Sequence, residues 1–307
     1  MAITDTTNSP LRSLQSASAW LGSDPLGAGA LRGHVMLVHF WTYSCVNWLR
    51  TLPYVRAWHR RYEAHGLLVI GAHAPEFGFE HDLENVRRAR TQLEVDYPVA
   101  IDNGFEIWRA FGNHYWPALY LLDEDGRVRF RHLGEGAYVE TEQAIQRMLG
   151  VHEELSDVNA SGLAAPADTA TLRSPETYLG RARGERRSER PGRELVLNEW
   201  ALEGRWSIGE EAATLDAAVG SIACRFQARD VNLVLAPPQC AAVPFAVLLD
   251  GRPPGDDRGL DVEAPGGGSV RAPRMYQLIR RRHASAPSTL EVEFLDPGVR
   301  AYVFTFG

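Results

Sequence analysis

A cysteine stands where an apolar strand pattern changes into a helical one, and this transition constrains the fold more than any other feature of the chain. Residues 35–40 are almost entirely apolar and predict a strand that is buried on both faces. The helical pattern runs from Cys45 to about His65, with a kink expected at Pro53. A cysteine at a helix N-terminus lies among unpaired backbone N–H groups at the positive end of the helix dipole, which favours the thiolate. Cys45 is therefore the candidate nucleophile.

Strand and helix patterns alternate from about residue 10 to residue 150, which indicates an α/β domain over residues 1–150. Asp125-Gly126 lies between two alternating apolar runs and predicts a β-hairpin. The other expected elements are strands at 67–72 and 97–102, helices at 83–93, 105–111 and 141–149, and hairpin strands at 116–122 and 127–132.

The composition changes after residue 150. Residues 151–192 are rich in Ala, Ser, Pro, Gly and Arg and predict a linker, with an apolar pair only at Tyr178-Leu179. Residues 193–307 predict an all-β sandwich or jelly roll, because short apolar strands recur between Gly, Pro and Asp turns. The expected strands are 195–197, 222–226, 231–235, 245–250, 275–279, 289–294 and 301–306.

Charge and hydropathy exclude several classes of function. The net charge of −7 argues against binding to nucleic acid or to an anionic membrane surface. All 32 basic residues are arginine, so Schiff-base lysine chemistry is excluded. No apolar run is long enough for a membrane span, and residues 1–9 do not resemble a secretory signal. As written, the sequence predicts a cytoplasmic protein without direct membrane insertion.

The three cysteines are Cys45, Cys224 and Cys240, and their wide spacing predicts neither a zinc site nor any other metal site. No cofactor is expected. Cys224 alternates with apolar residues and should face the sandwich core, whereas Cys240 lies in a Pro-rich loop. A disulfide between these two is disfavoured by the cytoplasmic expectation.

The motif Phe-Trp-x-x-Ser-Cys-x-Asn, followed by an apolar helix and a later Trp-Pro before a hairpin, resembles the thioredoxin fold. More narrowly, the chain resembles the soluble C-terminal region of the DipZ-type thiol:disulfide interchange proteins. The matching stretches are 40–54, 74–77, 115–120, 134–136, 174–180 and 294–307.

This resemblance implies a thioredoxin-like domain followed by a β-sandwich similar to carbohydrate-binding modules. It also implies an extracytoplasmic location and electrons supplied by a membrane electron-transport domain, here expected as a separate protein. Residue 48 departs from the pattern, because Trp48 stands where the family has its second active-site cysteine. We therefore expect Cys45 to form a mixed disulfide with a disulfide-containing protein or a small-molecule thiol, and an external thiol to resolve it.

The expected substrate contacts are Trp41, Trp48, Trp116 and Pro117. The resemblance places Trp116-Pro117 at the family's cis-proline, beside the nucleophile. Trp48 has two interpretations: it shields Cys45 from water, which raises the thiol pKa, or it fills the inner face of the helix.

Three residues are candidates for proton transfer or for orienting a substrate: Thr42, His73 and Glu76. His73 and Glu76 follow a central strand, where loops gather around the site of an α/β sheet. Thr42 precedes Cys45 with the T-x-x-C spacing of peroxiredoxins, and Arg50 could hold the thiolate, so a one-cysteine peroxidase is an alternative.

A second alternative is a redox-inactive scaffold that binds a peptide or a glycan. In the β-domain, Trp200, Trp206 and Tyr276 could form a sugar-stacking face, although aromatic residues of a small sandwich more often belong to its core.

Overall fold

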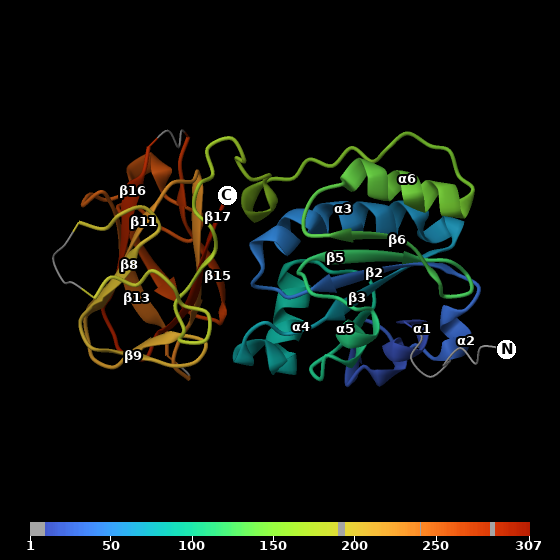
Figure 1. Ribbon diagram of the computed structural model, residues 1–307, viewed down its shortest axis with the longest axis horizontal. Coiled ribbons are helices and arrows are strands. Elements are labelled where there is room, and N and C mark those ends of the chain that lie inside the picture. The colour runs from blue at the N-terminus through green and yellow to red at the C-terminus, as the bar shows by residue number, and fades with distance from the viewer. Residues whose placement is uncertain (1–9, 190–193, 240, 283–285) are drawn as a thin grey trace. The chain divides into compact units, whose positions relative to one another are not determined.

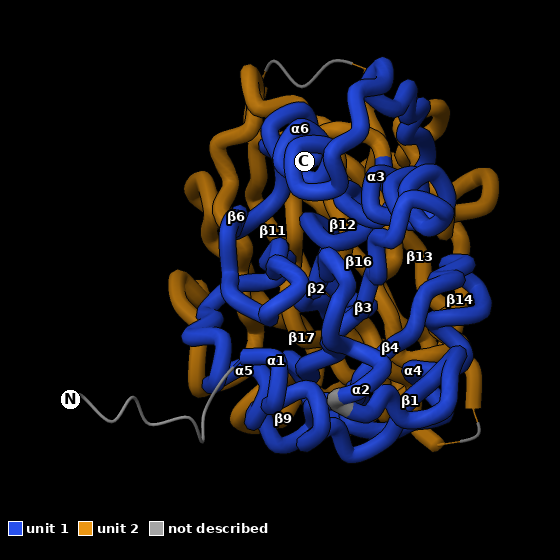
Figure 2. Tube along the Cα trace, turned by 90° about the vertical axis from the view of Figure 1, so that its right-hand side faces the viewer, with its two compact units in different colours: residues 1–164 blue, residues 165–307 orange. Residues whose placement is uncertain are grey.

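The computed structural model describes residues 10–189, 194–239, 241–282 and 286–307. The chain divides into two compact units, Met1–Ala164 and Ala165–Gly307, which are coloured separately in Figure 2.

The first unit is built on a six-stranded sheet with the order β1-β4-β3-β2-β5-β6. The two central strands, β2 (Val35–Trp41) and β3 (Leu67–His73), are parallel, and every residue of β2 is buried. β4 runs parallel to β3, whereas β5 and β6 form the expected antiparallel hairpin. The remaining strands are β1 (Ala19–Leu21), β4 (Val99–Ile101), β5 (Ala118–Leu122) and β6 (Val128–Leu133). The expected thioredoxin-like fold is confirmed.

Helices cover both faces of this sheet. α3 (Val46–Tyr62) and α6 (Tyr138–Leu149) lie side by side on one face, where the rings of Tyr54 and Tyr138 stack at 3.6 Å (Figure 1). On the other face, α1 (Pro10–Ser13) and α5 (Glu106–Ala110) close an aliphatic and aromatic core around β2 and β3. The other helices are α2 (Ala28–Leu31), α4 (Leu83–Gln92) and the short 3-10 turns η2 (Leu14–Ser16), η3 (Glu63–His65), η4 (Gly78–His81) and η5 (Gly162–Ala164).

The second unit is a sandwich of two antiparallel sheets, as predicted. One sheet has the order β15-β12-β17-β10-β9, with β7 paired to β17, and the other has the order β14-β13-β16-β11-β8. Apolar side chains from both sheets meet in one core. The strands are β7 (Thr177–Tyr178), β8 (Trp200–Glu203), β9 (Trp206–Ile208), β10 (Ala213–Leu215), β11 (Gly220–Phe226), β12 (Asp230–Ala236), β13 (Val243–Leu249), β14 (Gly267–Val270), β15 (Arg274–Arg280), β16 (Ser288–Phe294) and β17 (Arg300–Phe306), with the 3-10 turn η6 (Gly255–Asp257).

Two of the predicted segments differ from the structure. Residues 195–197 are not a strand, because Val196 and Leu197 are exposed and turn the chain into β8. The predicted linker is not a separate spacer throughout its length: β7 joins the second unit's sheet, and Leu179 is buried in the sandwich core. The boundary between the units lies within the predicted linker, after Ala164.

Candidate functional site

Cys45 is the residue that immediately precedes α3. Its backbone is extended (φ −81°, ψ 117°), and its carbonyl accepts the N–H of Leu49 at 3.0 Å, which is the first turn of the helix. Its own N–H donates to the carbonyl of Thr42 at 3.3 Å and closes the turn that leaves β2. α3 continues for 17 residues, through Pro53, so Cys45 lies at the positive end of a long helix dipole.

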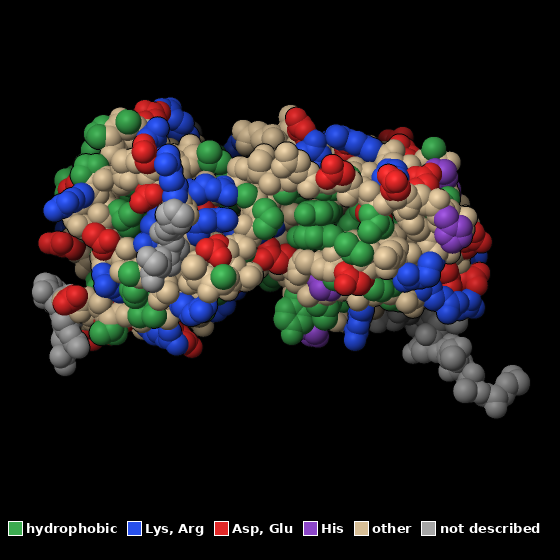
Figure 3. All heavy atoms as spheres, turned by 90° about the horizontal axis from the view of Figure 1, so that it is seen from above, with side chains coloured by type: hydrophobic (Ala, Val, Ile, Leu, Met, Phe, Trp, Pro, Cys, Tyr) green, Lys and Arg blue, Asp and Glu red, His purple; other side chains and the backbone are tan. Residues whose placement is uncertain are grey.

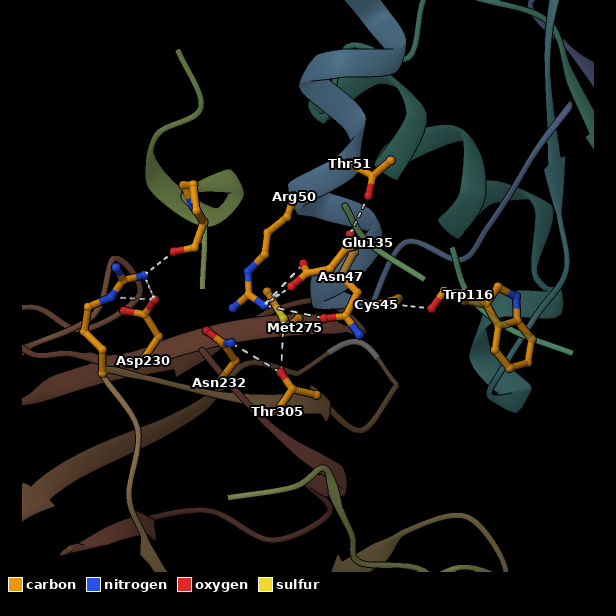
Figure 4. A network of polar contacts seen from close by, with 12 residues as sticks. Cys45, Asn47, Arg50, Thr51, Trp116, Glu135, Asp230, Asn232, Met275 and Thr305 are labelled. Atoms are coloured by element: carbon orange, nitrogen blue, oxygen red, sulfur yellow. Dashed lines mark hydrogen bonds and ion pairs between the residues drawn. The ribbon is translucent and has the colours of Figure 1, made fainter. Parts of the chain in front are cut away.

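The Cys45 sulfur points toward the loop that opens β5. Cys45 Sγ lies 3.7 Å from the carbonyl oxygen of Trp116, and the Trp116–Pro117 peptide bond is cis (Figure 4). The Trp116 indole N–H donates to the Ala74 carbonyl at 3.0 Å, and its ring packs against Trp108 with a centroid distance of 4.4 Å. These contacts hold the Trp116 carbonyl, which precedes the cis-proline Pro117, beside the Cys45 sulfur.

Trp41 and Trp48 are fully buried behind this loop. Their indole rings stack with centroids 4.4 Å apart and planes inclined by 23°. Because both side chains belong to the packed interior, their position favours support of the Cys45 turn over direct contact with a substrate.

His73 and Thr42 are also fully buried, whereas Glu76 is half-buried in the loop after β3. Burial lowers the pKa of His73 to about 3, and the nearby His81 acts in the same direction. His73 is therefore neutral throughout the pH range in which a thiol reacts. Its ring lies edge-on to Trp41 at 4.9 Å and nearly parallel to Tyr43 at 6.0 Å.

Glu80, which the sequence interpretation missed, is a buried carboxylate directly behind the Cys45 turn. It lies in η4 and is completely inaccessible to solvent. Its Oε1 accepts the hydroxyl of Ser44 at 2.6 Å, and its Oε2 accepts the N–H groups of Glu76 and Phe77 at 2.7 Å and 3.0 Å. The only local signal was an acidic residue three positions after Phe77, the spacing of a helix capping box.

Arg50 lies one turn into α3. Its Nη1 is 3.5 Å from the Asn47 side-chain oxygen and 3.5 Å from both carboxylate oxygens of Glu135 (Figure 4). Arg50 is therefore already engaged by a carboxylate from the loop after β6.

The second unit's predicted candidates belong mostly to its core. Cys224 is completely buried, as expected, and burial raises its thiol pKa to about 12. Cys240 lies outside the described residues. Trp200 and Tyr276 are almost fully buried, whereas Trp206 is partly exposed. Trp200 and Trp206 both line a cavity of about 490 Å³, together with Arg181 and Arg187.

Surface charge, metal-binding groups and membrane-spanning helices are three further features that bear on function. Arg side chains are interspersed with Asp and Glu on the face shown in Figure 3. Among the described residues, no group of His, Cys, Asp and Glu could hold a metal ion. In the same residues, no helix is both long and apolar enough to cross a membrane.

Two family models match the chain. Residues 9–149 match Redoxin, and residues 174–307 match the family described as thioredoxin like C-terminal domain. The Redoxin match agrees with the thioredoxin-like fold of the first unit, and the second match spans the β-sandwich.

Among individual proteins, the chain is similar to Protein DipZ of Mycobacterium bovis and of Mycobacterium tuberculosis. It is 32% identical to each over 316 residues, which cover 96% of this chain and 42% of DipZ. The chain thus spans less than half the length of these relatives. The thiol-disulfide oxidoreductase YkuV of Bacillus subtilis is 25% identical over 144 residues, which cover 47% of this chain and 97% of YkuV.

Proposed function

We propose that the chain is a thiol–disulfide oxidoreductase that acts through the single nucleophile Cys45. The observation that carries this proposal is the placement of the Cys45 sulfur at the N-terminus of α3, 3.7 Å from the Trp116 carbonyl that precedes Pro117. A helix N-terminus stabilises a thiolate, and the adjoining loop presents backbone to an extended substrate.

The proposed reaction has two balanced steps. The Cys45 thiolate attacks one sulfur of a substrate disulfide, forms a mixed disulfide and releases the other sulfur as a thiolate. An external thiol then attacks the mixed disulfide, returns Cys45 to its thiolate and leaves with the substrate sulfur as a new disulfide. An external thiol is needed because residue 48 is tryptophan and offers no second sulfur.

Within this proposal, Trp116 and Pro117 contact the substrate, and Trp41 and Trp48 support the turn from behind. Thr42 and Glu76 border the site and are the remaining candidates for orienting a substrate. His73 has a different role: as a neutral, buried ring it packs against Trp41 rather than carrying a proton.

The partners proposed are a disulfide-containing protein and a thiol donor. The similarity to DipZ favours a membrane electron carrier as the source of electrons, and hence an extracytoplasmic site of action. Fractionation of cells that produce the protein, followed by trapping of mixed disulfides on Cys45, tests the compartment and the partners together.

The experiment that tests the function is turnover of a model disulfide with and without an added thiol such as glutathione. We expect turnover only with the added thiol, complete loss in Cys45→Ser, and no change in Cys224→Ser, which is a matched control because Cys224 is buried in the other unit. An equal rate in wild type and Cys45→Ser would contradict the proposal and favour the redox-inactive scaffold. Consumption of hydrogen peroxide through Cys45, without disulfide turnover, would instead favour the one-cysteine peroxidase.

A further inference from the structure

Glu80 joins two loops that are far apart in the sequence. Through Oε1 it binds both the N–H of Ser44, at 3.3 Å, and the Ser44 hydroxyl, at 2.6 Å. Through Oε2 it binds the N–H groups of Glu76 and Phe77 in the loop after β3. Because Ser44 is bonded directly to Cys45, this one carboxylate anchors the turn that carries the nucleophile.

No cation of the described residues forms an ion pair with Glu80. When the Glu80 carboxylate is ionised, only hydrogen-bond donors stabilise its charge. Solvent screens this charge poorly because the side chain is fully buried. Burial raises the pKa of Glu80 to about 7, and the charge of Glu76 acts in the same direction, whereas the Ser44 hydroxyl lowers it.

The charged residue that acts on the Glu80 carboxylate is Glu76, in the loop after β3. His81, in η4, acts on His73, which lies at the end of β3. His73 stays neutral because its pKa is lowered to about 3. On α3, Arg50 is engaged by Glu135, so the positive charge nearest to Cys45 along the helix is already shared with a carboxylate.

We propose that Glu80 is a positioning residue that holds the Ser44–Cys45 turn and makes the reactivity of the Cys45 thiol depend on the protonation of Glu80. This inference rests on the proposed function of Cys45. When Glu80 is ionised, its negative charge opposes formation of the thiolate one residue beyond its hydrogen-bonded partner. When Glu80 is protonated, that opposing charge is absent. The two groups therefore titrate as a coupled pair.

The test is the rate of Cys45 alkylation by iodoacetamide between pH 5 and 10, read by mass spectrometry on the intact native protein. In the wild type we expect two inflections, one of them near pH 7. In Glu80→Gln we expect a single inflection at lower pH, with alkylation about tenfold faster at neutral pH, which corresponds to a coupling of about one pKa unit.

Two further variants separate charge from structure. Ser44→Ala keeps the carboxylate but removes the hydroxyl that lowers its pKa, so the Glu80 inflection should move to higher pH. Glu84→Gln removes an exposed carboxylate at the start of α4 and should leave the profile unchanged. Ser44→Ala keeps the test decisive if Glu80→Gln fails to fold, as judged by circular dichroism.

Each outcome has one meaning. If both variants change the rate by the same factor at every pH and leave the inflections in place, Glu80 has only a structural role and the inference is overturned. If the wild-type profile shows a single inflection that Ser44→Ala does not move, the coupling is absent and the inference is likewise overturned, although the proposed function of Cys45 stands. If native Cys45 is not alkylated at any pH, the proposed function itself fails.

Discussion

The indole of Trp48 stacks on the indole of Trp41, with ring centroids 4.4 Å apart and both side chains fully buried. Trp48 is three residues after Cys45, so it occupies the inner face of α3 one turn into the helix. Gly71 on β3 makes room for this pair, because a Cβ there would lie 2.8 Å from the Trp41 indole nitrogen. The position at which a dithiol protein would carry its second sulfur is thus part of the packed interior of this domain.

Replacing Trp48 with alanine should strongly destabilise the first unit. A cavity left by a buried tryptophan costs about 3–5 kcal/mol of unfolding free energy. Trp48→Phe, which keeps a ring against Trp41, should cost clearly less. Urea unfolding monitored by circular dichroism measures both, and equal losses in the two variants would contradict the stacked packing.

Replacing Trp48 with cysteine should supply an internal resolving thiol. A sulfur one helical turn after Cys45 can attack a mixed disulfide on Cys45, so the mixed disulfide should decay without an external thiol. The matched control is Asn47→Cys, which places a sulfur on the same helix at a partly exposed position that contacts Arg50. Mass spectrometry after treatment with a model disulfide should show an internal disulfide between Cys45 and the introduced sulfur only in the Trp48→Cys variant. A long-lived mixed disulfide in both variants would show that a thiol at position 48 cannot reach the Cys45 sulfur.

The thiols of Cys45 and Cys224 should differ greatly in native reactivity. Cys45 is 8% exposed at a helix N-terminus, whereas Cys224 is 0% exposed and its burial raises the thiol pKa to about 12. In native protein, iodoacetamide should modify Cys45 and leave Cys224 intact until urea unfolds the sandwich. Peptide mapping of the alkylated protein measures this, and early modification of Cys224 would disagree with its position in the core.

The two buried histidines of the sheet should make the first unit sensitive to acid. Burial lowers the pKa of His39 and of His73 to about 3, so the folded state stays unprotonated while the unfolded state binds protons below pH 6.5. The two neutral histidines make their full contribution to the free energy of unfolding above pH 6.5. This contribution is lost as the pH falls toward 3, by an amount on the order of a few kcal/mol for each histidine.

His73→Phe should reduce this acid-dependent loss, because phenylalanine does not bind a proton. The substitution also removes no hydrogen bond of the ring, since neither ring nitrogen of His73 has a partner among the described residues. The exposed His114→Gln is the control. Glu80 has the opposite dependence, since its raised pKa gives stability that is lost as the pH rises from 4.5 to about 7. The difference in unfolding free energy between wild type and His73→Phe, measured from pH 4 to 7, isolates the histidine, and a pH-independent difference would argue against its burial as a neutral ring.

Much of the architecture could be predicted because local patterns report local structure. The apolar run of β2, the amphipathic helix α4 and the hairpin at Asp125-Gly126 all lie where their residues predict them. Short strands such as β9, β10 and β14 escaped prediction, since three or four residues carry too little periodicity to distinguish a strand from a loop.

The sequence by itself determined that Cys45 lies between a buried strand and a helix, because that position depends only on residues next to it in the chain. It also determined that residue 48, three positions after Cys45, is a tryptophan and not a second cysteine. Only the tertiary structure decided which groups surround the cysteine. Trp116 is 71 residues away and Glu80 is 36 residues from Ser44, and each reaches the site through the order and register of the sheet. The burial that keeps His73 neutral and raises the pKa of Glu80 has the same origin, since desolvation depends on everything packed around a group and not on its neighbours in sequence.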